Sequence, residues 1–122
     1  MESILLSIKT LIGGAFVDSS DFDTDLIINI NSALSILHQL GLGPEDGFKI
    51  TSDSETWSDF LGTDVKTLED AKIYVYLRTR LTFDPPANSF LVNAIEKDIK
   101  ELEWRLNVAA EPLGSTEETG NG

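Results

Sequence analysis

Three aspartates at alternate positions, Asp21, Asp23 and Asp25, have the spacing with which a calcium-binding EF-hand loop begins. That loop also needs glycine at its sixth position and a bidentate glutamate at its twelfth. Leu26 and Ser32 occupy those two positions here. We therefore expect no calcium site, and interpret the aspartates as the capped start of a helix on an acidic surface.

The other residue types that carry chemistry are scarce or wrongly spaced. His38 is the only histidine and the chain has no cysteine, so a two-histidine metal site, a disulfide and a thiolate nucleophile are excluded. The glycine-rich segment 41–47, GLGPEDG, lacks the lysine and hydroxyl residue of a P-loop and places two acids where phosphate would lie. No GxSxG string occurs. We expect a protein that is not an enzyme and that has no cofactor and no metal.

The charge is strongly negative and uneven along the chain. The 122 residues include 21 acidic and nine basic ones, for a formal net charge of -12. Ten of the acids and a single base, Lys49, lie between Asp18 and Asp64, whereas most bases lie in the last two predicted helices. Non-specific binding to nucleic-acid phosphates is therefore not expected, and one side of the molecule should be strongly negative.

Helical periodicity predicts the elements that must position these residues. Apolar residues recur at helical spacing over 3–12, 24–40, 65–82 and from 89 to 107, and candidate N-cap residues stand at the start of the last three segments. The last stripe is the most regular, with steps of four, four, three and four between Leu91, Ile95, Ile99, Leu102 and Leu106. On the third helix the inward residues are predicted to be Leu68, Ala71, either Tyr74 or Val75, Leu77 and Leu81.

Two segments between the predicted helices are irregular. Residues 41–64 form a long loop in which 48–51 permits a short strand or hairpin, while Trp57, Phe60 and Leu61 could anchor one turn of helix on the core. The second segment is a structural turn in which two prolines stop the third helix, and it comprises Phe83, Asp84, Pro85 and Pro86.

The predicted fold is thus mainly α, a small bundle of about four helices with a long central loop. We expect one helical domain over residues 1–107 and an acidic, flexible tail over 108–122, because the tail is rich in Pro, Gly and acids and almost lacks large apolar residues. No stretch approaches the roughly 18 consecutive apolar residues of a membrane span, so no membrane partner is expected.

A few large side chains on the last two helices are candidates for a subunit interface. Tyrosine and arginine are enriched in protein contacts, and four of them cover more than one face of the third helix, while Trp104 lies to one side of the stripe on the fourth. A core helix with a solvated basic side explains the third helix about equally well. The candidates are Tyr74, Tyr76, Arg78, Arg80 and Trp104.

Several strings in this order resemble the head-tail connector, or adaptor, proteins of long-tailed bacteriophages. They are SILLSIKTLIGG, FDTDLIININSALSILHQLGLGP with the following GFKIT, WSDFLG, KIYVYLRTRLTFDPPANSF and IEKDIKELEWRLN. Together they cover about residues 3–107, and the combination of FDPP with ELEWRLN is the most specific part.

The resemblance implies a virion structural protein that is made in the host cytoplasm and located at the neck. Such subunits form a ring, here expected to have twelve copies, beneath the portal, and the ring joins the capsid to the stopper or tail. DNA would pass through the channel without specific binding. The resemblance also implies that the C-terminal segment reaches toward the portal, with Val108, Ala109, Ala110 and Leu113 as its apolar anchors.

The residues alone leave a second hypothesis open. An acidic helical adaptor or regulator could bind a basic protein partner through the aspartate-rich region between Asp18 and Asp64. The two hypotheses differ in the mass of the protein in solution, alone and with portal.

Overall fold

The computed structural model describes residues 2–63 and 66–110, apart from the side chain of Ala15. The regular elements of this part of the chain are all helices, and it contains no β-strand. Its elements are α1 (Ile4–Ile12), the short 3-10 helix η1 (Gly14–Phe16), α2 (Asp23–Gln39), α3 (Trp57–Leu61), α4 (Leu68–Phe83) and α5 (Ser89–Ala110). No helix within these ranges is long and apolar enough to cross a membrane.

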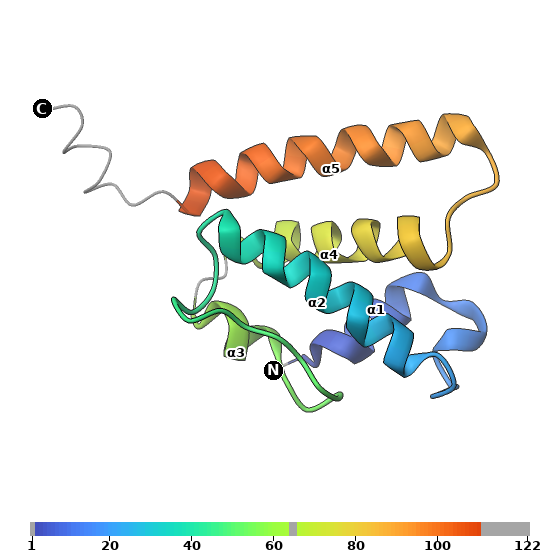
Figure 1. The fold of residues 1–122 in the computed structure, drawn as a ribbon, viewed down its shortest axis with the longest axis horizontal. Helices are drawn as coiled ribbons and strands as arrows, with labels where there is room; N and C mark the ends of the chain where they lie inside the picture. The colour runs from blue at the N-terminus through green and yellow to red at the C-terminus, as the bar shows by residue number, and fades with distance from the viewer. Residues whose placement is uncertain (1, 64–65, 111–122) are drawn as a thin grey trace, which may run out of the picture.

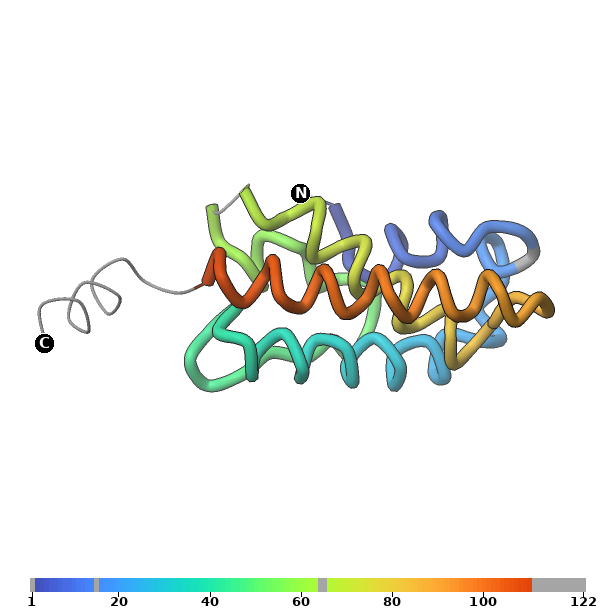
Figure 2. The backbone as a smooth tube through the Cα atoms, turned by 90° about the horizontal axis from the view of Figure 1, so that it is seen from above, coloured from blue at the N-terminus to red at the C-terminus, as the bar shows by residue number. Residues whose placement is uncertain are grey.

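The helix α4 lies at the centre of the bundle. It packs against α2 and α1 on one side and against α5 on the other, so that α5 forms an outer layer (Figure 1). Seen from above, α5 runs along the length of the molecule, with α4 crossing beneath it and α2 to one side (Figure 2). The arrangement leaves the outward face of α5 without a neighbour among residues 2–63 and 66–110.

Local interactions replace missing helical hydrogen bonds at the ends of three helices. The Ser3 hydroxyl accepts from the backbone N–H of Leu6 at the start of α1, and Gly13, at φ 79°, ends that helix. At α3, Thr56 and Asp59 form a reciprocal capping box. The carboxamide oxygen of Asn88 accepts from the backbone of the first turn of α5. Asn88 and Ser89 can both serve as the cap by residue type, and the structure assigns the role to Asn88. The predicted capped start of α2 is wrong, because within the described residues that helix begins without a side-chain cap.

The core is one continuous apolar cluster to which every α-helix contributes. The predicted stripes are largely confirmed, with both Tyr74 and Val75 fully buried on α4. The buried hydrophobic residues are Ile4, Leu5, Ile8, Leu26, Ile30, Ala33, Leu34, Leu37, Leu42, Ile50, Trp57, Phe60, Ala71, Tyr74, Val75, Ile95, Ile99, Leu102 and Leu106. Leu91, predicted to start the stripe of α5, is instead 49% exposed.

The predicted strand at residues 48–51 is wrong. Within the described chain this segment is an extended loop, and Ile50 satisfies its backbone N–H and C=O on the side chain of Asn31 in α2 instead of on a second strand. The predicted helical turn is confirmed as α3, in which Trp57 and Phe60 are buried. Gly43 lets the loop approach α3, since a Cβ there would collide with the ring of Phe60.

Two helix boundaries differ from those predicted. The third predicted helix begins at Leu68 instead of residue 65, and the proposed cap Asp64 lies outside the described residues. The last helix continues through Val108, Ala109 and Ala110, so the boundary predicted after residue 107 lies inside α5. The added turn is held because Asn107 donates to the carbonyl of Leu40 and Ala110 packs against the core.

Candidate interaction surfaces

Tyr74 joins α4 to α5 inside the subunit. Its ring is fully buried, and its hydroxyl donates a 2.7 Å hydrogen bond to Oε2 of Glu103. Burial, together with the hydrogen bond to Glu103, raises the pKa of the Tyr74 hydroxyl, so that it stays a neutral donor. The assignment of Tyr74 to a subunit interface is therefore corrected: the side chain belongs to the core.

Arg78 takes part in the same network. Its guanidinium lies 3.7 Å from Oε2 of Glu103 and 5.9 Å from the centre of the Tyr74 ring. One carboxylate on α5 thus holds both a tyrosine and an arginine of α4. Arg78 is half-buried and already engaged within its own subunit, which reduces what it can offer to a neighbour.

Tyr76 and Arg80 lie two residues after Tyr74 and Arg78, respectively, and therefore on the opposite side of α4. The Arg80 guanidinium donates to the Tyr76 hydroxyl at 3.3 Å and to the Asp84 carbonyl at 3.4 Å, and has no carboxylate partner among the described residues. Tyr76 is partly buried and packs against the core. Arg80 therefore keeps an unneutralised positive charge that a neighbouring molecule could use.

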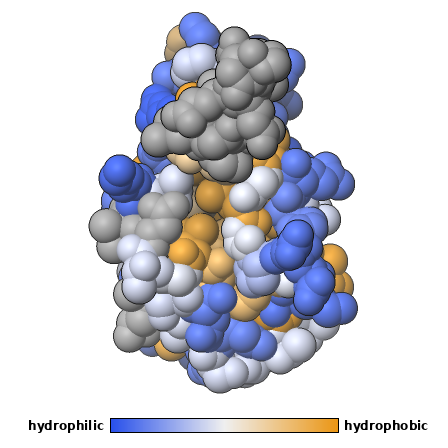
Figure 3. Space-filling view, turned by 90° about the vertical axis from the view of Figure 1, so that its left-hand side faces the viewer, coloured by the Kyte–Doolittle hydropathy of each residue, from blue (hydrophilic) through white to orange (hydrophobic). Residues whose placement is uncertain are grey.

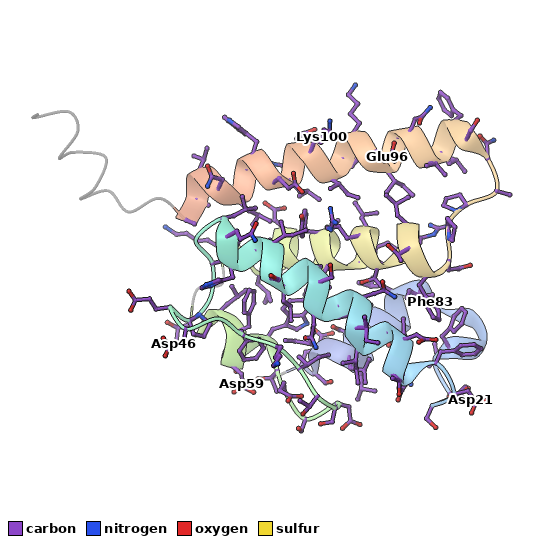
Figure 4. All side chains as sticks on the ribbon, in the orientation of Figure 1. Asp21, Asp46, Asp59, Phe83, Glu96 and Lys100 are labelled. Carbon is purple, nitrogen blue, oxygen red and sulfur yellow. The ribbon has the colours of Figure 1, made fainter. Side chains whose placement is uncertain are left out.

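The structural turn after α4 is anchored by three aromatic rings. Phe83 makes edge-on contacts with Phe16 and Phe22, with ring centroids 5.0 and 5.8 Å apart, and the latter two rings also touch each other. This cluster ties the end of α4 to η1 and to the start of α2. No periodicity in the sequence predicts this cluster, because Phe16 lies in the short helix η1 and Phe22 in the turn before α2. Phe83 and Asp21 lie at the same end of the molecule in Figure 4.

A second link near this end was not predicted. Lys9 on α1 is 5% exposed, and its ammonium group lies 2.8 Å from Oδ1 of Asp23 and donates to the Ser19 carbonyl. One aspartate of the acidic run is thereby neutralised and used to fasten α2 to α1. The apolar periodicity of α1 gave no indication that its lysine points inward.

Exposed carboxylates gather at both ends of the bundle. Asp21 lies at the end that carries Phe83, whereas Asp46 and Asp59 lie near α3 at the opposite end (Figure 4). Within the described ranges no group of three or more His, Cys, Asp or Glu side chains could hold a metal ion. His38 lines an open groove of about 330 Å³ beside Asp46 and Lys49.

The outward surface of α5 carries the remaining candidates. Trp104 is 68% exposed, in agreement with its predicted place beside the core stripe, and Val108 is 49% exposed. Ala109 is exposed, while Ala110 packs against the core. Leu113, the fourth residue predicted to dock on the portal, lies outside the described residues. Next to this end of α5, hydrophobic side chains gather in the middle of a hydrophilic surface (Figure 3).

Comparison with protein families gives one match that spans the whole bundle. The family model described as phage connector protein matches residues 4–112, which include all of α1 to α5. Comparisons with curated proteins and with solved structures gave no match. The resemblance drawn from the strings of the sequence is thus confirmed, and the chain belongs to the phage connector protein family.

Proposed function

We propose that this connector subunit forms a ring of twelve copies beneath the portal, joins the capsid to the stopper or tail, and lines the channel for the DNA. The observation that carries the proposal is the family match over residues 4–112. It covers the complete described helical bundle and not a single motif.

The charge of the subunit is suited to a channel through which DNA slides. The net charge is -12, and acids such as Asp21, Asp25 and Asp46 are exposed. DNA phosphates are repelled by such a surface, whereas a basic lining would hold them through released counterions. This favours passage of DNA without specific binding.

A closed ring needs two different, complementary surfaces on each subunit. Arg80 on α4 carries a positive charge without a carboxylate partner in the described structure. Asp21, just before α2, and Asp25, in its first turn, are exposed and negative. We place ring contacts between these surfaces of adjacent copies, with Tyr76 beside Arg80. Arg78 contributes less, since Glu103 already pairs with it.

Docking on the portal is assigned to the end of α5 and the residues that follow it. Val108 and Ala109 are exposed on the last turn of α5. A hydrophobic area lies at the same end of the molecule (Figure 3). Leu113 is included in this proposal by its apolar type alone. Exposed apolar groups beside a hydrophilic rim are typical of a protein contact.

The experiment that tests the role is to mix the purified protein with purified portal, measure the mass of the complex, and locate the subunit in micrographs of virion necks. A portal-bound ring is expected. A monomer that does not bind portal and binds only basic proteins would overturn the proposal. It would favour the hypothesis that the protein is an acidic regulator.

The ring contact is tested by the charge reversal Arg80→Glu. We expect it to weaken ring formation in the presence of portal, while Lys49→Glu, which makes the same charge change on an exposed loop residue, leaves assembly intact. Equal assembly of both variants would remove Arg80 from the interface.

A further inference from the structure

The outward face of α5 carries a second regular stripe. Its members recur with steps of four, three, four, three and four, and all of them are exposed. In order they are Phe90, Ala94, Lys97, Glu101, Trp104 and Val108. Phe90 is 76% and Trp104 68% exposed, so two of the largest apolar side chains of the chain face solvent here.

This stripe lies opposite the buried one. At 3.6 residues per turn, its positions fall on the side of the helix facing away from Ile95, Ile99, Leu102 and Leu106, which pack into the core. A helix needs only one apolar stripe to join its own bundle. The second stripe has the alternating three- and four-residue spacing of a coiled-coil seam.

When two copies of the stripe run in opposite directions, the residues of one copy complement those of the other. If a second α5 lies antiparallel with its midpoint opposite residue 99, Phe90 meets Val108 and Ala94 meets Trp104 of the other copy, so that each layer combines a large and a small side chain. The two central layers then bring Lys97 of each copy opposite Glu101 of the other.

We propose that the free subunit forms a two-fold dimer through this outward face of α5, with the two helices antiparallel. The interface is isologous, and the same six residues of each copy form both halves. The outer layers are apolar and the centre holds two reciprocal ion pairs, which fix the register.

Charge selects this arrangement over a parallel one. In a parallel pair Lys97 would face Lys97 and Glu101 would face Glu101, and like charges in facing positions are unfavourable. Lys97 has no ion-pair partner among the described residues, so it is available. Glu101 pairs with Arg105 of its own helix at 2.8 Å. Because its side chain is 60% exposed, its carboxylate can also accept a hydrogen bond from a second cation.

The extent of the seam indicates a reversible dimer. From Phe90 to Val108 the helix rises about 27 Å, at 1.5 Å for each residue. One helix pair of this length lies at the small end of specific protein interfaces. The dimer does not rest on the proposed role in the virion. Trp104 and Val108 cannot face a second α5 and a ring or portal neighbour at once, so the dimer must dissociate before those contacts form.

The test is sedimentation equilibrium of the full chain without portal. We expect the wild-type mass to rise from one to two subunits with concentration, Lys97→Glu to remain monomeric, and Lys97→Glu combined with Glu101→Lys to dimerise again. Lys49→Glu is the matched control, because it makes the same charge change on an exposed loop residue that is not part of α5. A monomeric wild type, a dimeric Lys97→Glu variant, or a double variant that stays monomeric would each overturn the proposal.

Cross-linking tests the direction of the helices independently of charge. The chain has no cysteine, so Phe90→Cys and Val108→Cys each introduce a single thiol. A short bismaleimide should join the two variants when they are mixed and should not join either variant to itself, because the equivalent residues lie at opposite ends of the seam. Self-joining of the Phe90→Cys variant, or no product from the mixture, would contradict an antiparallel pair.

Discussion

The side-chain amide of Asn31 pairs with both backbone groups of Ile50, nineteen residues later in the chain. Its nitrogen donates to the Ile50 carbonyl at 2.9 Å, and its oxygen accepts from the Ile50 N–H at 2.7 Å. One side chain of α2 thus takes the place of a neighbouring strand and holds Ile50 in the core, where it is 1% exposed.

We predict that Asn31→Ala destabilises the fold by about 2 kcal/mol, because it leaves a backbone donor and acceptor unpaired at a partly buried site. Urea unfolding followed by circular dichroism measures the change. Asn29→Ala is the control, since the Asn29 amide bonds only to the Asp25 carbonyl of its own helix. Equal losses for both variants would show that Asn31 does not hold the loop.

Removal of the Tyr74 hydroxyl should weaken the contact between α4 and α5. Tyr74→Phe deletes the hydrogen bond to Glu103 but keeps the buried ring, so we expect a loss of about 1 kcal/mol in the free energy of unfolding. Tyr76→Phe is the matched control, because that hydroxyl accepts only a 3.3 Å contact from Arg80. A larger loss in the control would contradict the central role given to the Tyr74–Glu103 bond.

The carboxylate of Glu55 should make the stability of the folded protein depend on pH. Burial acts to raise its pKa, but hydrogen bonds from Thr51 and Ser52 outweigh it and lower the pKa of Glu55 below its ordinary value of 4.5. Because its pKa is lower in the folded than in the unfolded state, the Glu55 carboxylate stabilises the folded protein at pH values above 4.5. This stabilisation is lost as the pH falls through the pKa that Glu55 has in the folded state.

We therefore expect Glu55→Gln to lower the melting temperature near pH 7 and to match the wild type once the pH is below the folded pKa. Thermal melts across this range measure the difference. Asp53→Asn, on an exposed neighbour, should show no such convergence. A difference between wild type and Glu55→Gln that persists in acid would point to packing instead of charge.

Much of the fold followed from local pattern, and the exceptions have particular causes. Apolar periodicity predicted the stripes of α2 and α5 because each packs one face into a single core. It failed at residues 48–51, where alternation predicted a strand but the partner is the side chain of Asn31, a tertiary contact that no local pattern reveals.

The sequence indicated which residue types could form contacts, but not which of those side chains lie at the surface. Trp104 was placed off the core stripe and is exposed, whereas Tyr74 was open to either assignment because both it and Val75 fit the inward face. The hydroxyl of Tyr74 bonds to Glu103, a residue of another helix, and no pattern within α4 reveals this contact. The inward direction of Lys9 likewise depends on Asp23.

The two prolines of the turn between α4 and α5 should stabilise the angle between these helices. Proline fixes φ and cannot continue a helix, so Pro85→Ala with Pro86→Ala lets the unfolded chain gain freedom. We expect nearly unchanged helix content and a loss of about 1–2 kcal/mol. Pro44→Ala, in an exposed loop, is the control. Unchanged stability would mean that the Phe83 cluster alone sets the turn.

The last prediction concerns how the subunit reaches the portal. The helix α5 extends to Ala110, so the informative truncation removes the residues after 110 and not those after 107. The shorter chain keeps the hydrogen bond of Asn107 to Leu40 and the packing of Ala110, and its fold should be intact by circular dichroism. We expect portal binding at least tenfold weaker, because Leu113 and its acidic neighbours are lost.

A second truncation, after residue 107, separates the contribution of the helix end from that of the segment beyond it. It also removes the exposed Val108 and Ala109, so we expect a further loss of portal binding together with a small loss of stability from Ala110. Binding is measured by surface plasmon resonance on immobilised portal, with the Lys49→Glu variant as a folded reference. If both truncated proteins are folded and bind portal as tightly as the full chain, the docking surface lies elsewhere on the bundle, and the exposed end of α5 is left to contacts between connector subunits.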